Sequence, residues 1–162
     1  MKKIIIFAIL SFGLFAETVK VDLDSIIAKH PKFEIMKTDL EKEKTKLQEV
    51  LDIKQNELNT EEAALEAKGD KVTEEEAVAF YKKEQELQNL FAQAQTNLSN
   101  LKNQKMQSIY TDILNAIEIL YKEKKYTAII DSEAIIQGKD NVKDVSDEVV
   151  KLLKGTEKIS LF

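Results

Sequence analysis

The segment Lys32 to Lys125 contains no proline and a single glycine, and it constrains the fold more than any other part of the sequence. In its first part, leucines recur at seven- and four-residue steps, and in its second part apolar residues recur at seven-, four- and three-residue steps. These two series are Leu40, Leu47, Leu51, Leu58 and Leu65, and then Phe80, Leu87, Phe91, Ala94, Leu98 and Leu101. Such narrow apolar stripes on otherwise polar helices suit pairing with one partner helix. The pattern predicts a long antiparallel helical hairpin.

The turn of this hairpin is predicted near Gly69-Asp70, because glycine is the common residue just past a helix end. Thr73-Glu74-Glu75-Glu76 then forms a capping box, in which the Thr73 hydroxyl and the Glu76 carboxylate satisfy backbone N–H groups at the start of the return helix. Past Lys105 the apolar stripe widens, which predicts that the return helix enters a fuller core. The widened stripe comprises Met106, Ile109, Ile113, Ile117, Leu120 and Tyr121.

Short β-like segments flank the hairpin. Thr18–Leu23 alternates apolar and polar residues and predicts a half-buried strand, followed by a short helix that begins at Asp24 or Ser25. Pro31 suits the first turn of the next helix. Residues 126–131 and 134–137 predict two more strands joined by a turn. Ser146 then suits the start of a helix that Gly155 would end.

We therefore predict a mainly α fold with a small β base. Residues 32–105 form a helical-hairpin, coiled-coil arm with its tip near 69–72, and residues 17–31 and 106–162 form a mixed α+β oligomerisation body. Exposed strand edges are usually paired or covered, so we expect symmetric assembly through the apolar strand residues. These are Val19, Val21, Leu23, Ile129, Ile130, Ile135 and Ile136. The tail after Gly155 reads as an edge strand or a loose apolar end.

Residues 1–16 are typical of a cleaved signal peptide. Lys2 and Lys3 precede an apolar run to Phe15, and Ala16 is a plausible cleavage residue. The run is shorter than the roughly 20 residues needed to span a bilayer, so we expect an exported protein with no stable membrane insertion after cleavage. Cleavage would leave 22 lysines and 29 acidic residues, a net charge of −7. That charge disfavours general nucleic-acid binding.

No pattern in the sequence indicates an enzyme, a metal site or a cofactor. His30 is the only histidine, and with no acid fixed beside it we expect a loop residue without a chemical role. Gly69-Asp70 lacks the ligand spacing of a calcium loop. No glycine-rich phosphate loop, nucleophile elbow or zinc spacing is present.

Some apolar residues of the arm can contact another macromolecule. Most of the leucines are needed for the seam between the two helices, because a hairpin must bury something to exist. Phe80 and Tyr81 are adjacent and point about 100° apart on a helix, so both cannot face one narrow seam. We take Leu65, Phe80, Tyr81 and Phe91 as candidate contact residues.

The chain resembles the Skp (OmpH-like) family of periplasmic chaperones. The resemblance rests on element order and on three segments, Val19–Asp22, the tip Lys68–Thr73, and the ending that runs from Tyr126–Asp131 to Asn141–Val150. It implies a jellyfish-shaped homotrimer whose three arms enclose a cavity. It also implies an ATP-independent holdase that binds unfolded outer-membrane β-barrel proteins in the periplasm and prevents their aggregation.

The sequence departs from better-known family members in its charge. They are basic, whereas eight acids and only Lys68 and Lys71 lie between residues 57 and 76 of this arm. The acids are Glu57, Glu61, Glu62, Glu66, Asp70, Glu74, Glu75 and Glu76. A lipopolysaccharide site is therefore not carried over, and basic partners are favoured. The alternative function is an exported coiled-coil structural protein or adhesin that assembles through its hairpins.

Overall fold

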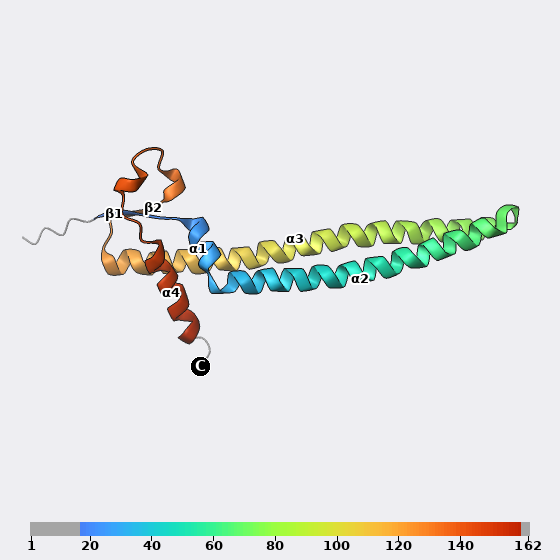
Figure 1. Ribbon diagram of the computed structural model, residues 1–162, viewed down its shortest axis with the longest axis horizontal. Helices are drawn as coiled ribbons and strands as arrows, with labels where there is room; N and C mark the ends of the chain where they lie inside the picture. The colour runs from blue at the N-terminus through green and yellow to red at the C-terminus, as the bar shows by residue number, and fades with distance from the viewer. Residues whose placement is uncertain (1–16, 160–162) are drawn as a thin grey trace, which may run out of the picture. The chain divides into compact units, whose positions relative to one another are not determined.

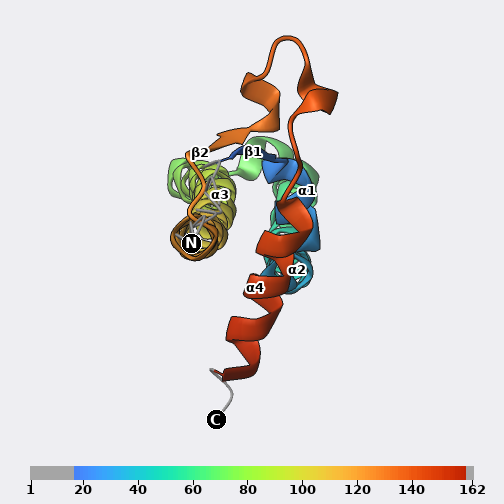
Figure 2. The same cartoon turned by 90° about the vertical axis from the view of Figure 1, so that its left-hand side faces the viewer.

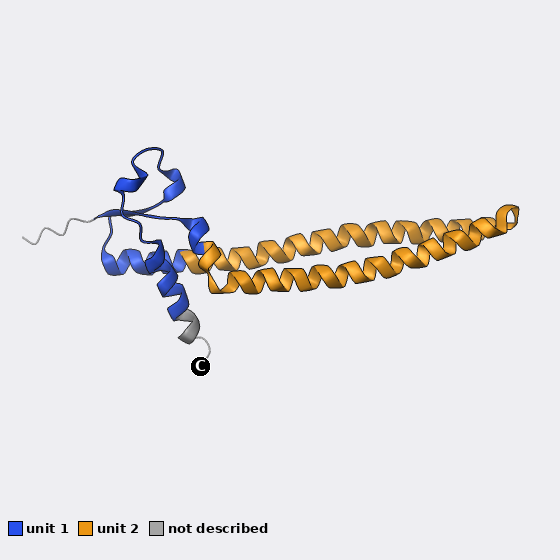
Figure 3. Ribbon diagram, in the orientation of Figure 1, with its two compact units in different colours: residues 1–26, 114–162 blue, residues 27–113 orange. Residues whose placement is uncertain are grey.

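The computed structural model describes the backbone of residues 17–159 and the side chains of residues 17–155. The predicted signal peptide and the last three residues lie outside this range. The chain forms two compact units, one of residues 27–113 and one of the described residues among 1–26 and 114–162 (Figure 3). The elements, shown in Figure 1, are β1 (Thr18–Val21), α1 (Leu23–Lys29), α2 (Pro31–Lys68), α3 (Glu74–Lys124), β2 (Ala128–Asp131) and α4 (Ser146–Ile159), with short 3₁₀ turns at Gly69–Lys71, Ser132–Ala134 and Lys139–Asn141.

The unit of residues 27–113 is the predicted helical hairpin. Helix α2, of 38 residues, and helix α3, of 51 residues, lie side by side and are connected at one end by a tight turn (Figures 1 and 2). Their seam buries a few apolar side chains, which are Met36 and Leu58 on α2 and Ala94, Ile109 and Ile113 on α3. Leu58 and Ala94 belong to the two apolar series of the sequence, whereas Phe91 of the second series is 51% exposed.

The turn at the tip forms as the sequence predicts. Gly69 has φ 53° and ψ −127°, a conformation that L side chains rarely adopt, and its N–H donates to Glu66 O. The capping box is closed in both directions. Thr73 N–H donates to Glu76 Oε2 (3.1 Å), and Glu76 N–H donates to Thr73 Oγ1 (3.2 Å).

The second unit is organised around β1, which is paired on both sides. On one side β1 pairs in parallel with β2, from Thr18 opposite Ala128 to Val21 opposite Asp131. On the other side Lys20 N–H donates to Lys143 O (2.9 Å), and Val145 N–H donates to Lys20 O (3.0 Å). Three short segments that lie far apart in the sequence therefore share one hydrogen-bonded layer.

Both faces of β1 are covered, whereas the sequence pattern predicted a half-buried strand. Val19 and Val21 are buried on one face. On the other face Lys20 is only 7% exposed, and its Nζ donates to Lys139 O at 2.6 Å. The long lysine stem is buried while its charged end reaches a backbone carbonyl, and this explains how an apparently polar face is enclosed.

The strand predicted at 134–137 does not form. Asp131 Oδ1 accepts the N–H of Glu133 (3.1 Å) and begins the 3₁₀ turn Ser132–Ala134, so the chain leaves the sheet instead of folding back as a hairpin. Ile136 is 96% exposed. The small sheet therefore has two strands, β1 and β2, and they are parallel.

Two helix boundaries also differ from the prediction. Leu23 belongs to α1 rather than to the first strand, because Asp22 Oδ1 accepts the N–H of Ser25 (2.9 Å) and starts the helix earlier. Helix α4 begins at Ser146 as predicted but runs through Gly155 to Ile159. At its start Asp144 Oδ1 accepts the Ser146 N–H (2.9 Å), while the Ser146 hydroxyl accepts Asp22 N–H (2.8 Å).

The core of this unit joins α1, the end of α3, α4 and the strands. Its buried apolar side chains are Val19, Val21, Ile26, Ala116, Leu120, Tyr126, Val145, Val149, Val150 and Leu153. The widened stripe of α3 contributes Leu120 here, as the sequence indicated. No helix in the described part of the chain has both the length and the apolar character required to cross a bilayer.

We predict that Thr73→Ala lowers the free energy of unfolding by about 1 kcal/mol, because it removes the side-chain acceptor at the start of α3. Urea denaturation followed by circular dichroism measures this change. Thr96→Ala is the matched control, because Thr96 lies inside α3 and its hydroxyl bonds only to the preceding turn at Ala92 O. The control is expected to be neutral or slightly stabilising, since alanine is the better helix former. Equal losses in both variants would contradict the capping argument.

Candidate functional site

The seam of the hairpin is thin for its length. Only Met36 and Leu58 are buried along the whole of α2, and seam leucines such as Leu47, Leu51 and Leu65 are half-buried. Buried apolar surface stabilises a helix pair at roughly 25 cal/mol per Å². A seam of this kind holds two helices together but leaves much of their apolar surface in contact with solvent.

Four ion pairs connect α2 with α3 along the hairpin. They are Lys32 with Asp112 (2.6 Å), Asp39 with Lys105 (2.7 Å), Glu61 with Lys83 (2.6 Å) and Lys68 with Glu76. The Lys105 ammonium, through its hydrogen bond, lowers the pKa of Asp39. The hydrogen bond from Lys68, and then that from Thr73 N–H, lowers the pKa of Glu76. Partly exposed pairs contribute little each, so their main effect is to fix which residues of the two helices face each other.

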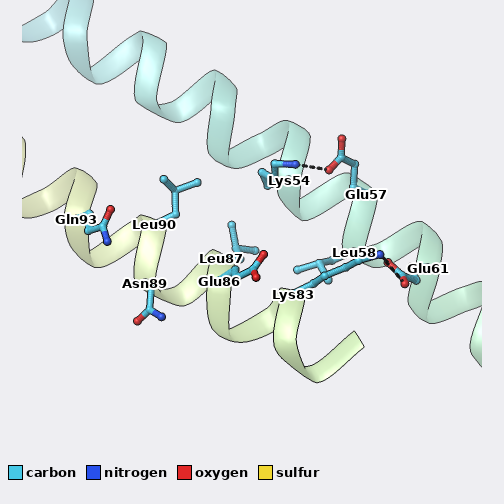
Figure 4. Close-up of a pocket in the computed structure, with 10 residues that line it drawn as sticks. All are labelled: Lys54, Glu57, Leu58, Glu61, Lys83, Glu86, Leu87, Asn89, Leu90 and Gln93. Carbon is cyan, nitrogen blue, oxygen red and sulfur yellow. Dashed lines mark hydrogen bonds and ion pairs between the residues drawn. The ribbon is translucent and has the colours of Figure 1, made fainter. Parts of the chain in front are cut away.

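A groove of about 560 Å³ opens between the helices in the half of the hairpin nearer its tip. Leu58, Leu87 and Leu90 form its apolar part, and charged and amide side chains surround them (Figure 4). These polar residues are Lys54, Glu57, Glu61, Lys83, Glu86, Asn89 and Gln93. Two ion pairs lie within this ring, Lys54–Glu57 at 2.8 Å and Lys83–Glu61. The hydrogen bond to Glu57 raises the pKa of Lys54.

A second groove, of about 430 Å³, has a different chemistry. Leu51, Leu87 and Phe91 line it together with four polar residues, Gln48, Asp52, Gln55 and Gln88. Leu87 is the one residue that both grooves share. Glu86 and Gln88 line different grooves and point about 160° apart on a helix. The two grooves therefore open on opposite faces of the hairpin, one ringed by charges and the other mainly by amides.

The four candidate contact residues do not form a single site. Phe91 is 51% exposed and lines the amide-ringed groove. Tyr81 is 65% exposed, and Phe80 is half-buried with its ring edge-to-face against Tyr81 at 6.3 Å between centroids. Leu65 is half-buried in the seam. As the helical spacing predicted, Phe80 and Tyr81 do not both face the seam.

The predicted oligomerisation residues also separate into groups. Val19 and Val21 are buried in the core of their own unit, and Leu23, Ile129 and Ile135 are half-buried. Ile130, at 36% exposed, and Ile136 are the accessible ones. Within residues 17–159, the edge of β2 that faces away from β1 pairs with no strand.

Helix α3 carries a largely exposed apolar stripe that was not predicted from the sequence. Tyr110, Leu114, Ile117 and Tyr121 recur at four- and three-residue steps and so share one face of the helix. Leu114 is 62% exposed, and Tyr110 and Tyr121 are each 43% exposed. The sequence predicts that the widened α3 stripe enters the core. Ile113 and Leu120 are buried there, Ile117 is half-buried, and Tyr121 is exposed.

His30 is not the isolated loop residue that the sequence suggested. It is 4% exposed, and its Nε2 lies 3.6 Å from Asp112 Oδ2 on α3. The two residues lie far apart in the sequence, and only hairpin closure brings them together.

Residues 18–153 match the sequence profile of the family described as outer membrane protein (OmpH-like). The chain belongs to the OmpH-like family. The matched range covers the hairpin and both flanking parts of the second unit, and so includes the grooves, the exposed α3 stripe and β2.

Among solved structures, the chain is similar to a protein of Caulobacter crescentus CB15, provisionally assigned as an outer membrane chaperone (OmpH-like) and determined at 2.83 Å resolution. The TM-score is 0.75 and the sequence identity is 17%, over 86% of this chain and 84% of that chain. At this identity the likeness shows that the two proteins share a fold. No curated protein sequence matches the chain.

We predict that Leu58→Ala lowers the free energy of unfolding by about 2 kcal/mol, at the low end for a buried leucine because the neighbouring groove lets the site adjust. Val50→Ala is the control, since Val50 lies on the same helix and is 46% exposed. We expect the control to change stability by less than about 0.5 kcal/mol. Urea denaturation of both variants measures the difference, and a negligible loss for Leu58→Ala would show that the seam does not depend on this contact.

Proposed function

We propose that this OmpH-like protein is an ATP-independent holdase chaperone of the periplasm. It binds unfolded outer-membrane β-barrel proteins between its helical arms and prevents their aggregation. The observation that carries the proposal is a hairpin that leaves apolar and aromatic side chains exposed along a charged, helical arm. Family membership and the fold shared with a protein assigned as an outer membrane chaperone support it.

The chemistry of the arm suits binding without a fixed substrate pose. Apolar burial is non-directional, so any unfolded segment with apolar side chains gains from contact with the arm. Side chains of Leu51, Leu87 and Phe91 offer such contacts, and the glutamines around them can donate to and accept from an extended backbone. Leu65, Phe80, Tyr81 and Phe91 are the proposed contact residues. This function requires no catalytic group and no cofactor.

A closed oligomer would place several arms around one cargo chain. The exposed stripe Tyr110, Leu114, Ile117 and Tyr121 and the outer edge of β2 favour self-association, because both leave groups that another chain can cover. In a closed symmetric oligomer, the same surface is covered in every copy of the chain. We propose a homotrimer, the number that the family resemblance implies.

The location and the partners follow from the sequence as proposals. Residues 1–16 would direct export, and the mature chain would act in the periplasm. The acidic segment from 57 to 76 would repel anionic lipid headgroups and attract basic segments of cargo. Lipopolysaccharide and nucleic acid are therefore not proposed as partners.

The direct test dilutes a urea-unfolded outer-membrane β-barrel protein into buffer with or without residues 17–162 and follows turbidity. We expect the protein to keep the cargo in solution without ATP. Cargo that aggregates equally in both samples would overturn the holdase proposal. Polymerisation of the protein alone through its hairpins would instead support the alternative of an exported structural protein or adhesin.

We predict that replacing both exposed aromatics, as Tyr81→Gln and Phe91→Gln, weakens cargo binding about ten-fold or more, since exposed aromatic anchors often contribute more than 1 kcal/mol each. Fluorescence titration of labelled, unfolded cargo measures the change. The control is the pair Gln85→Ala and Gln95→Ala, two exposed polar positions on the same helix. Circular dichroism verifies that both double variants keep their helices. Equal affinities would exclude these aromatics as cargo contacts.

We predict that Leu114→Asp shifts the protein from an oligomer to a monomer, because it puts a charge in the middle of the α3 stripe. Sedimentation equilibrium measures the mass. Glu118→Gln is the control, because Glu118 lies one turn further along α3 in an exposed pair with Lys122. A Leu114→Asp protein with unchanged mass would show that the stripe is not the self-association surface.

A further inference from the structure

The chain contains a single histidine, which lies between the end of α1 and the start of α2. His30 is the N-cap residue of α2, in extended conformation, and Pro31 occupies the first helical position. The imidazole Nδ1 accepts the backbone N–H of Lys32 at 3.1 Å. A histidine ring thus satisfies one of the unpaired N–H groups that every helix start leaves.

This hydrogen bond fixes the protonation state of the ring. A ring nitrogen that accepts an N–H carries no proton, so the imidazole is neutral with its proton on Nε2. Nε2 faces Asp112 Oδ2 at 3.6 Å, and Lys32 Nζ donates to the same oxygen at 2.6 Å. The direct bond between the start of α2 and the facing turn of α3 is therefore that of Lys32 with Asp112, and the ring lies beside it at a distance longer than a hydrogen bond.

We propose that His30 is a proton-sensitive latch at the base of the hairpin. The neutral ring caps the first turn of α2, and Lys32 in that turn pairs with Asp112 on α3. Protonation converts the Nδ1 acceptor into a donor and releases the cap. Mild acid then loosens the first turn of α2 while the rest of the hairpin stays folded.

The charges around the ring determine the direction of this effect. A proton on His30 places a positive charge at the N-terminus of α2, where the helix dipole disfavours it, and burial disfavours it further. Asp112 favours the proton, but its oxygen is already bonded to Lys32. Lys29 adds positive charge at the end of α1, and Glu34 in the first turn of α2 is engaged with Lys37 at 3.1 Å. The helix dipole, burial and the charge of Lys29 therefore oppose protonation of His30. Only the Asp112 carboxylate, which Lys32 shares, favours it.

The sign of the pH dependence follows from proton binding. An unfolded histidine takes up a proton near pH 6.5, whereas the folded state disfavours that proton. The unfolded state then binds more protons in mild acid, so stability falls as the pH decreases through this range. The latch concerns the free protein, so its tests do not depend on the cargo proposal.

The first test uses residues 17–162 labelled with ¹⁵N. At pH 7.5 we expect the imidazole spectrum to show a proton on Nε2 and none on Nδ1. Between pH 7.5 and 5.5 we expect amide exchange at Lys32 and Phe33, corrected for its intrinsic pH dependence, to rise about five-fold or more, which corresponds to the loss of a helix cap. A proton on Nδ1 at neutral pH, or corrected exchange that does not change, would overturn the proposal.

The decisive variant is His30→Asn, because asparagine is a good N-cap residue that does not titrate in this range. The smaller asparagine side chain can lower stability at every pH, so the readout is the pH dependence of amide exchange. We expect the corrected exchange rate at Lys32 in this variant to be independent of pH. As a second variant, Asp112→Asn removes the carboxylate that favours the proton, and we expect its transition to move to lower pH. If amide exchange at Lys32 in His30→Asn depended on pH as it does in the wild-type protein, the latch proposal would be overturned.

Discussion

The narrow apolar seam between α2 and α3 is the constraint on which the rest of the structure depends. Two long helices that bury so few side chains are held by marginal apolar contact, with ion pairs that fix which residues face each other. Tyr81 lies off the narrow stripe and is exposed, and Phe91, although it belongs to the stripe, is only partly covered. The feature that makes the hairpin marginal also leaves apolar side chains exposed, and the proposed cargo binding depends on them.

The second unit addresses a different problem, the pairing of short strands. Two strands of four residues each are unstable alone, and here β1 is sandwiched between β2 and the segment 143–145. The buried Lys20 and the bonds of Ser146 to Asp22 and Asp144 join the beginning of the chain to its end. The outer edge of β2 and the α3 stripe are the surfaces on which the proposed oligomer depends.

Local signals in the sequence predicted local structure well. The hairpin, its turn at Gly69 and the reciprocal bonds of Thr73 and Glu76 follow from periodicity and from residues a few positions apart. Failures occurred where distant partners decide. Burial of Lys20, for example, needs the carbonyl of Lys139. The missing strand at 134–137 has a local cause instead, because the Asp131 side chain starts a 3₁₀ turn. The pairing of His30 with Asp112 appears only when the hairpin closes.

We propose that several arms of this protein hold one unfolded chain. The most direct measurement is the absolute mass of residues 17–162 by light scattering, alone and with a urea-diluted outer-membrane β-barrel protein. The account predicts a particle of three chains that gains one cargo chain and stays in solution. A monomer, or an open-ended polymer that leaves the cargo to aggregate, would contradict it.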